Sequence, residues 1–368
     1  DGLLARPLAA LVCDAVAGTE RPLNRAASML HRIPLRAAGT TEHAQAQVRR
    51  GGVPLSAMEL DTLAVHPINA NENTPQAPIY ACGEAIDMDA DCGGYNLAWA
   101  WLPLPPPSPI ATKHPTSPRS PMLEISQISC RLADGGDERS CIEACTREAL
   151  SILRCRRADI ERIELRRKSI DARKKSNVHF TLSALVHLAS EVDEADLLSR
   201  LSDRDRERVR AVDADDPSFP APVQDGLCEH RPVVVGAGCA GLFAALTLAE
   251  AGLRPILLER GDDATQRTEA VEHFNATGAL DTESNIQFGL GGAGTFSDGK
   301  LNTGTKNPLH RLVLKTLVEA GAPRDILWDA KPHIGSDILP DVVTNLIARI
   351  ERLGGTVRFR THVSNLLL

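Results

Sequence analysis

The sequence predicts an α/β protein, and three observations lead to this class. Three consecutive valines at 233–235 run directly into a glycine-rich turn, as the first strand of a nucleotide-binding unit does. An apolar helix is expected from about residue 241 to residue 251, and the stretch "RPILLER" at 254–260 is expected to form the next strand. Strand, glycine turn, helix and strand in this order indicate a Rossmann-like domain, which we expect to be incomplete and to occupy residues 226–368.

One further helix and one further strand are expected near the end of this domain. The stretch "VVTNLIARIERL" at 342–353 has its apolar residues at the spacing of an amphipathic helix. Gly354 and Gly355 then turn the chain into an expected strand.

Residues 122–225 are predicted to form a small α+β domain before the Rossmann-like domain. Alternating apolar residues predict its strands, and apolar residues three and four positions apart predict its helices. The expected elements are a strand at 122–132, a helix at 138–154, strands at 160–170 and 177–190, and a helix at 193–201. The order βαββα suggests a ferredoxin-like split βαβ unit.

The first 121 residues divide into two regions. Residues 1–102 have a mixed, moderately apolar composition, whereas residues 103–121 are rich in Pro and Ser and have no apolar periodicity. Pro lacks a backbone N–H and fixes φ, so residues 103–121 are expected to be an extended linker.

The composition excludes several classes of protein. The formal net charge of −7 gives no reason to expect nucleic acid or a membrane as a partner, and no apolar run is long enough to cross a bilayer. The nine cysteines contain no C-x-x-C pair, so we expect reduced thiols, no bound metal and a cytoplasmic protein.

The glycine turn is the strongest functional signal in the chain. Gly236, Gly238 and Gly241 fit G-x-G-x-x-G, in which the glycines allow a tight turn, a close approach to a pyrophosphate and close packing of helix on strand. The pyrophosphate would lie at the helix N-terminus, where free N–H groups favour an anion. Glu259, 23 residues after Gly236, would accept hydrogen bonds from ribose hydroxyls and would repel a 2′-phosphate.

A second glycine-rich stretch, "ESNIQFGLGGAGTFSDGKL" at 283–301, follows this turn. Together with "RRKSIDARKK" (166–175), "VVVGAGCAGLFAALTLAEAGLRPILLERG" (233–261) and "AKPHIGSDIL" (330–339), it makes residues 122–368 resemble the amino-terminal part of a family of FAD-dependent dehydrogenase-like proteins. The resemblance implies an FAD site. It adds as candidate cofactor-binding residues Arg260, Gly291, Gly292, Gly294, Thr295, Ser297, Lys300 and Val363.

The stretch "APIYACGEAIDMDADCGGYNLAWAW" at 77–101 resembles a different family, the BaiN-like NAD(P)/FAD-dependent oxidoreductases, at its carboxy-terminal end. The preceding residues 44–63 match the same family, so the resemblance implies that residues 1–102 are a carboxy-terminal fragment of a BaiN-like flavoprotein. The resemblance implies flavin contacts from Gly83, Glu84, Asp87, Gly93, Gly94, Tyr95 and Asn96. The acidic run "DMDAD" lacks the Gly and Glu of an EF-hand, so it does not indicate a calcium loop.

The function expected from these motifs is that of an FAD-dependent oxidoreductase with an unknown small-molecule substrate and NAD(P)H as a candidate electron donor. No catalytic residue can be named, although Asp298 and Lys300 are the best charged candidates near the flavin. Two alternatives remain: an NAD-dependent dehydrogenase that uses the same turn, and a binding module that uses the basic stretch 166–175. We also expect residues 1–121 and 122–368 to derive from two adjacent flavoprotein genes, so that no flavin site is built from both.

Overall fold

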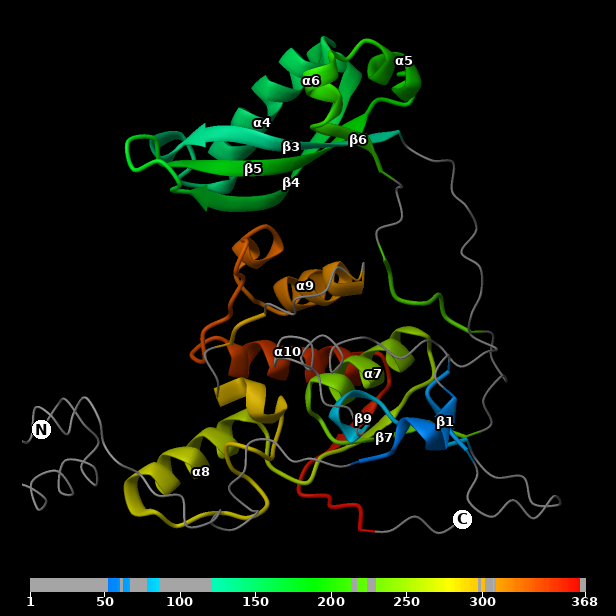
Figure 1. Ribbon diagram of the computed structural model, residues 1–368. Coiled ribbons are helices and arrows are strands. Elements are labelled where there is room, and N and C mark those ends of the chain that lie inside the picture. The colour runs from blue at the N-terminus through cyan, green and yellow to red at the C-terminus, as the bar shows by residue number, and fades with distance from the viewer. Residues whose placement is uncertain are drawn as a thin grey trace, which may run out of the picture. The chain divides into compact units, whose positions relative to one another are not determined.

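The computed structural model describes the small domain, most of the α/β region that follows it and three short pieces of the first hundred residues (Figure 1). The described residues are 52–59, 62–66, 78–86, 121–212, 217–223, 230–296, 299–301, 307 and 309–364. The expected linker therefore lies outside the described residues, except for Pro121.

The small domain is built on a four-stranded antiparallel sheet. Its strands are β3 (Met122–Arg131), β4 (Ile160–Asp171), β5 (His179–Leu188) and β6 (Val209–Ala211). The strands lie in the order β4-β5-β3-β6, so β5 separates the two strands that a helix connects. This is the strand order of a split βαβ unit.

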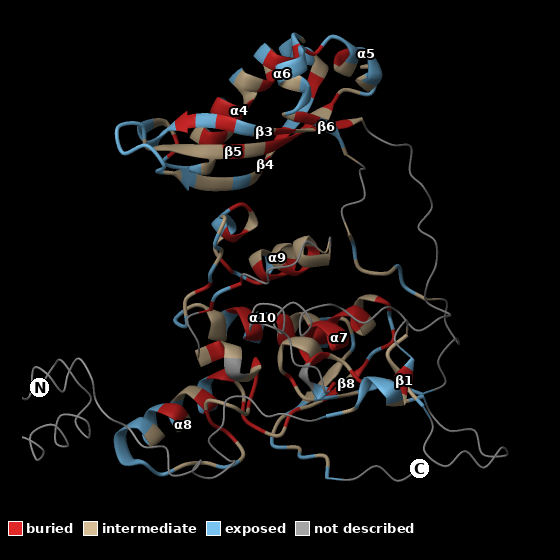
Figure 2. Cartoon of the chain, in the orientation of Figure 1, coloured by how far each residue is buried: buried red, intermediate tan, exposed pale blue. Residues whose placement is uncertain are grey.

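Three helices belong to this domain: α4 (Glu138–Leu153), α5 (Glu194–Ser199) and α6 (Asp203–Arg206). Helix α4 packs against the sheet, which it contacts at β3, β4 and β5 (Figure 1). It begins at Asp137, whose side chain accepts a hydrogen bond from the Ser140 backbone N–H at 2.7 Å, because the first N–H groups of a helix have no partner within it. Buried and more exposed residues alternate along β3 (Figure 2), as expected for a strand with one covered face.

The core of the small domain includes one residue that is far away in the sequence. Trp328 is only 8% exposed and clusters with the apolar residues of this domain. It follows the 3-10 helix η7 (Arg324–Leu327). The Lys168 backbone N–H donates to the Trp328 carbonyl at 2.7 Å, and the Ala330 N–H donates to the Lys168 carbonyl at 3.0 Å. Strand β4 is thereby paired on its outer edge.

The α/β domain after residue 230 contains a parallel sheet in the order β7-β8-β9. Its elements are β7 (Val233–Val235), α7 (Cys239–Glu250), β8 (Ile256–Leu258), α8 (Ala264–Thr277), η6 (Gly292–Phe296), α9 (Leu309–Glu319), α10 (Leu339–Arg352) and β9 (Thr356–Arg358). Within the described residues, β7 is paired on one side only. Val233 and Val235 are 57% and 59% exposed.

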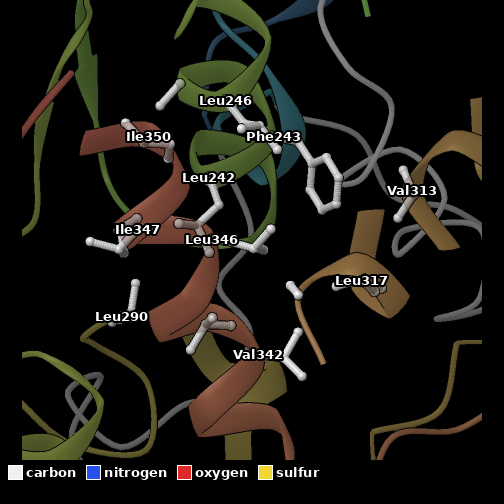
Figure 3. Packing of buried hydrophobic residues seen from close by; sticks show 14 of the residues in the cluster. Leu242, Phe243, Leu246, Leu290, Val313, Leu317, Val342, Leu346, Ile347 and Ile350 are labelled. Atoms are coloured by element: carbon white, nitrogen blue, oxygen red, sulfur yellow. The ribbon is translucent and has the colours of Figure 1, made fainter. Parts of the chain in front are cut away.

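Helices α7, α9 and α10 enclose the core of this domain. Figure 3 shows α7 and α10 side by side, with apolar side chains from both filling the space between them and residues of α9 completing the cluster. The labelled residues are Leu242, Phe243, Leu246, Leu290, Val313, Leu317, Val342, Leu346, Ile347 and Ile350. No helix in the described part of the chain is long and apolar enough to cross a membrane.

The described pieces of the first hundred residues form a small cluster of short elements. These are η2 (Leu55–Ala57), β1 (Met58–Glu59), β2 (Ala64–Val65) and η3 (Gly83–Ala85). Tyr80 pairs with Ala64 in an antiparallel bridge, and none of the described residues 78–86 pairs with β7. The 3-10 helix η3 contacts α7.

Most elements expected from the sequence are present, with shifted ends. The helix expected from about residue 241 begins earlier, at Cys239, because Gly238 serves as its N-cap. The strand expected at 254–260 is limited to Ile256–Leu258, the three residues that pair with both neighbouring strands. Among the α-helices and strands described after residue 121, four were not predicted: α6, β6, α8 and α9.

Candidate functional site

The turn after β7 has the backbone geometry that its first glycine implied. Gly236 has φ +93°, in the left-handed region that favours glycine. Its N–H donates to the Leu258 carbonyl at 2.7 Å, which holds the turn at the end of β8. The turn therefore begins at the carboxyl edge of the parallel sheet, where ligands of α/β proteins bind.

The other two glycines of the motif differ in what surrounds them. A Cβ on Gly241 would come within 1.8 Å of the Gly236 carbonyl oxygen, so this glycine permits close packing of α7 on the turn. A Cβ on Gly238 would meet no atom within 4 Å. Gly238 has φ −72° and ψ −177°, which any residue adopts. The absence of a side chain at Gly238 leaves open space at the N-terminus of α7.

The Glu259 carboxylate is buried beside this turn and is only 4% exposed. One carboxylate oxygen accepts a hydrogen bond from the Ala237 N–H at 2.7 Å, and the other accepts one from the Gly261 N–H at 2.8 Å. The acid predicted to bind ribose thus also ties the glycine turn to the residues after β8. A carboxylate has about four lone-pair sites, so two remain for ligand hydroxyls.

The second glycine-rich stretch packs directly against the first. The Gly291 N–H donates to the Ala237 carbonyl at 2.8 Å. A Cβ on Gly292 would lie 3.3 Å from the Gly238 Cα, and a Cβ on Gly294 would lie 3.8 Å from the Cys239 Sγ. The structure therefore brings the glycines at 291, 292 and 294 to the N-terminus of α7. Thr295 is nearby but buried, at 1% exposed, and its hydroxyl donates to the Leu290 carbonyl.

Two arginines that follow strands β8 and β9 form ion pairs. Arg260 pairs with Glu283 at 2.9 Å and stacks over the Phe288 ring at 4.0 Å, so its guanidinium is engaged by the second glycine-rich stretch. Arg360, just after β9, binds both Asp262 and Asp281. The hydrogen bond from Arg360 holds the pKa of Asp281 below its ordinary value.

The remaining predicted residues are less closely associated with the turn. Lys300 is exposed, and its backbone pairs with His333. Val363 is half-buried beyond β9, and Gly83 is buried in η3. Glu84 lies in the same 3-10 helix, although its side chain is outside the described set. Several predicted residues lie wholly outside the described residues: Asp87, Gly93, Gly94, Tyr95, Asn96, Ser297 and Asp298.

Sequence reasoning missed Arg267, which is completely buried on α8. Its guanidinium donates to four backbone carbonyls of the second glycine-rich stretch. Ala264, Arg267 and Val271 are the buried residues of α8 and lie on one helical face. This spacing could have indicated helix α8 in the sequence. The arginine in the middle of the buried face, however, makes that face look polar.

The basic stretch 166–175 is partly engaged by other groups of the protein. Arg166 lies 3.7 Å from Glu164, and Arg173 binds Asp171. Lys168 donates to the Gly135 carbonyl at 2.7 Å and lies over the Phe180 ring at 4.4 Å. These contacts use basic groups that a nucleic-acid surface would need. Among the described residues, no cluster of three or more His, Cys, Asp or Glu side chains could hold a metal ion.

Comparisons with known proteins agree with the position of the turn. Residues 231–281 match the family described as FAD binding domain, and residues 122–187 match a domain of unknown function, DUF8436. An uncharacterized protein of Clostridium beijerinckii is 45% identical over 212 residues, which cover 56% of this chain and 38% of that protein. The chain thus spans well under half the length of this relative. The first match favours FAD over NAD as the ligand of the glycine turn.

Proposed function

We propose that this chain carries the dinucleotide-binding part of an FAD-dependent oxidoreductase. The observation that carries the proposal is the open space at Gly238, at the N-terminus of α7. The N–H groups at the N-terminus of a helix and the helix dipole favour an anion at such a position. The similarity of residues 231–281 to an FAD binding domain supports FAD as the source of that anion.

The residues around the turn fit the two halves of such a ligand. The pyrophosphate would lie on the turn between Gly236 and Gly241, and Glu259 would accept hydrogen bonds from the ribose of the adenosine half. The loop of Gly291, Gly292 and Gly294 lies against the turn at Ala237 and Gly238. We propose that this loop contacts the flavin half.

The bound flavin would supply the redox chemistry, and the protein would supply binding and orientation. NAD(P)H is the proposed electron donor, and the substrate is a small molecule whose identity the described residues do not specify. We assign no catalytic acid or base. Lys300, the best charged candidate, is exposed and close in sequence to the glycine loop.

We also propose that residues 1–121 contribute nothing to this flavin site. The pairing of Tyr80 with Ala64, rather than with β7, supports this proposal. The 3-10 helix η3 does contact α7, so deletion of the N-terminal residues tests whether this contact matters for FAD binding. A chain that begins at Met122 should retain FAD as the 368-residue chain does, whereas loss of FAD on this deletion would establish a composite site.

The test of the main proposal is Gly238→Val in the 368-residue chain. The Cβ of the valine meets no protein atom within 4 Å, and the backbone conformation of Gly238 suits any residue, so the variant should fold normally and fail to bind FAD in a titration. Gly136→Val is the matched control, because a Cβ there also meets nothing within 4 Å but lies in the small domain. Unchanged FAD binding by Gly238→Val would refute the pyrophosphate assignment.

A further inference from the structure

Arg267 is a charged residue at a fully buried position of α8, with 0% of its surface exposed. Burying a charge is costly unless its hydrogen-bonding groups are satisfied. Desolvation lowers the pKa of Arg267 to about 10, a direct sign of that cost. Side-chain packing alone would be served better by an apolar residue, so the guanidinium needs another explanation.

The guanidinium is satisfied by the backbone of one loop. Its Nε donates to the Asn285 carbonyl at 2.9 Å, and its Nη2 donates to the Ile286 carbonyl at 2.9 Å. Its Nη1 donates to the carbonyls of Gly289 and Leu290 at 3.3 and 2.6 Å. Four carbonyls of the segment 285–290 thus turn inward around one planar cation. Lysine has its three donors on a single atom and could not serve four such acceptors in the same way.

The loop is shaped to admit this side chain. A Cβ on Gly289 would lie 2.4 Å from the Arg267 Cδ, so any larger residue at 289 would displace the arginine. The Asn285 side-chain oxygen accepts from the N–H groups of Gln287 and Phe288 at 2.9 and 3.2 Å, which closes the loop on itself. The Arg267 guanidinium also lies 4.8 Å from the centre of the Phe296 ring.

The same loop continues directly into the wall of the candidate site. The Leu290 N–H donates to the Asp262 carbonyl at 3.1 Å, and the Gly291 N–H donates to the Ala237 carbonyl at 2.8 Å. Gly292 then lies against Gly238. Displacement of the segment 285–290 would therefore move the residues that face the open space at Gly238.

We infer that Arg267 is a positioning residue that fixes the loop 285–296 for the flavin half of the ligand before the ligand binds. This inference rests on the proposed FAD function. The hydrogen bonds of Arg267 reach only the loop, whereas its interaction with Glu259 is an attraction between charges. Its loss should therefore weaken binding of FAD, which needs the loop, more than binding of ADP, which needs the turn and Glu259.

The test measures the dissociation constants of FAD and ADP by calorimetry for the 368-residue chain and for Arg267→Met and Arg267→Lys. We expect the affinity for FAD to fall at least about ten-fold in both variants, a loss of roughly 1.4 kcal/mol, and the affinity for ADP to fall by a clearly smaller factor. Amide hydrogen exchange of residues 285–296 should accelerate in the ligand-free variants, because the loop has lost the guanidinium that binds its carbonyl groups.

Two further variants control for a general loss of stability. Gly289→Ala keeps the arginine but places a Cβ 2.4 Å from its Cδ, so it should reproduce the selective loss of FAD affinity. Arg349→Met removes another partly buried arginine, one held by Glu250 and Glu319, and should leave both affinities unchanged. Equal losses of FAD and ADP affinity, or no loss of FAD affinity, would overturn the inference. A wild-type chain that binds neither ligand would instead refute the proposed function.

Discussion

The Glu259 carboxylate accepts a hydrogen bond from the Ala237 backbone N–H at 2.7 Å, across the gap between the turn after β7 and the end of β8. A second backbone N–H, from Gly261, binds its other oxygen. One acidic side chain therefore holds both sides of the candidate ribose site. Its substitution should affect the shape of the turn as well as the contacts with a ligand.

Glu259→Ala should weaken FAD binding roughly ten- to a hundred-fold, because a hydrogen bond to a charged group contributes about 1.5–3 kcal/mol. Fluorescence titration with FAD measures the change. Glu272→Ala, which removes an exposed acid from α8, is the control and should bind FAD normally. An unchanged dissociation constant for Glu259→Ala would exclude Glu259 as a ribose ligand.

Gly241→Ala should act through the fold and contrasts with the variant at Gly238. Its Cβ would lie 1.8 Å from the Gly236 carbonyl oxygen, so α7 must move away from the turn. We expect thermal unfolding at a lower temperature together with loss of FAD, at a cost of about 1–3 kcal/mol for an overpacked site. A variant that melts as the wild type does would show that the helix can shift freely here.

Trp328→Ala should destabilise the small domain, although residue 328 lies outside its contiguous sequence. The side chain is buried in the core of that domain, and its removal should cost about 3–5 kcal/mol. Urea unfolding followed by circular dichroism should show an earlier transition, and Trp328→Phe should recover much of the loss. Equal midpoints for Trp328→Ala and the wild type would mean that residues 122–212 complete their own core.

The cysteines of the small domain should differ sharply in reactivity. Cys130, Cys141 and Cys145 are buried, whereas Cys155 is half-buried, and burial raises the pKa of Cys145 to about 12. Because the thiolate is the reactive form, iodoacetamide at neutral pH should modify Cys155 first and leave Cys145 intact. Peptide mass spectrometry measures this order. Labelling in urea is the control, and equal rates for Cys145 and Cys155 in the native protein would contradict the burial.

The pair of Arg360 and Asp281 should contribute stability that depends on pH. Because the pKa of Asp281 is lowered in the folded state from the ordinary value of 3.8, the contribution is complete above that value and is lost as the pH falls through the lowered value. The side chains of Arg360 and Asp281 are 47% and 35% exposed. The pair should therefore contribute about 1 kcal/mol or less to the free energy of unfolding at neutral pH.

Asp281→Asn should therefore be less stable than the wild type at neutral pH, and the difference should vanish in strong acid, where wild-type Asp281 is protonated. Urea midpoints across this pH range measure the effect. Glu269→Gln, at an exposed position of α8, should show no such trend. A difference that persists in strong acid would assign the effect to packing rather than to charge.

The sequence predicted those elements whose apolar pattern matches their burial. The strands β3, β4 and β5 alternate clearly, and the amphipathic helix α10 has one buried face. Helix α9 buries Leu312, Val313 and Leu317 at plain helical spacing, so its sequence carried enough signal to find it. Helix α8 did not, because one of its three buried residues is Arg267.

The sequence predicted where in the chain the candidate site lies, but it did not predict the contacts between the residues of the site. The glycine spacing indicated the turn after β7, because backbone conformation and close packing restrict residue type there. The partners of Glu259 and Arg267 are backbone N–H and carbonyl groups, which every residue possesses. No pattern of side chains marks such partners, so these contacts required the fold.

The pairing of β7 on one side only, as seen among the described residues, has a practical consequence for handling this chain. In that part of the structure no strand pairs with the other side of β7, and Val233 and Val235 are 57% and 59% exposed. A bare strand edge of this kind is a template on which another polypeptide can add a strand. In concentrated solution the readiest source is a second copy of the same molecule, so pairs of chains should associate through β7 as the concentration rises. Apparent melting temperatures and ligand affinities are therefore comparable only at one fixed, low protein concentration.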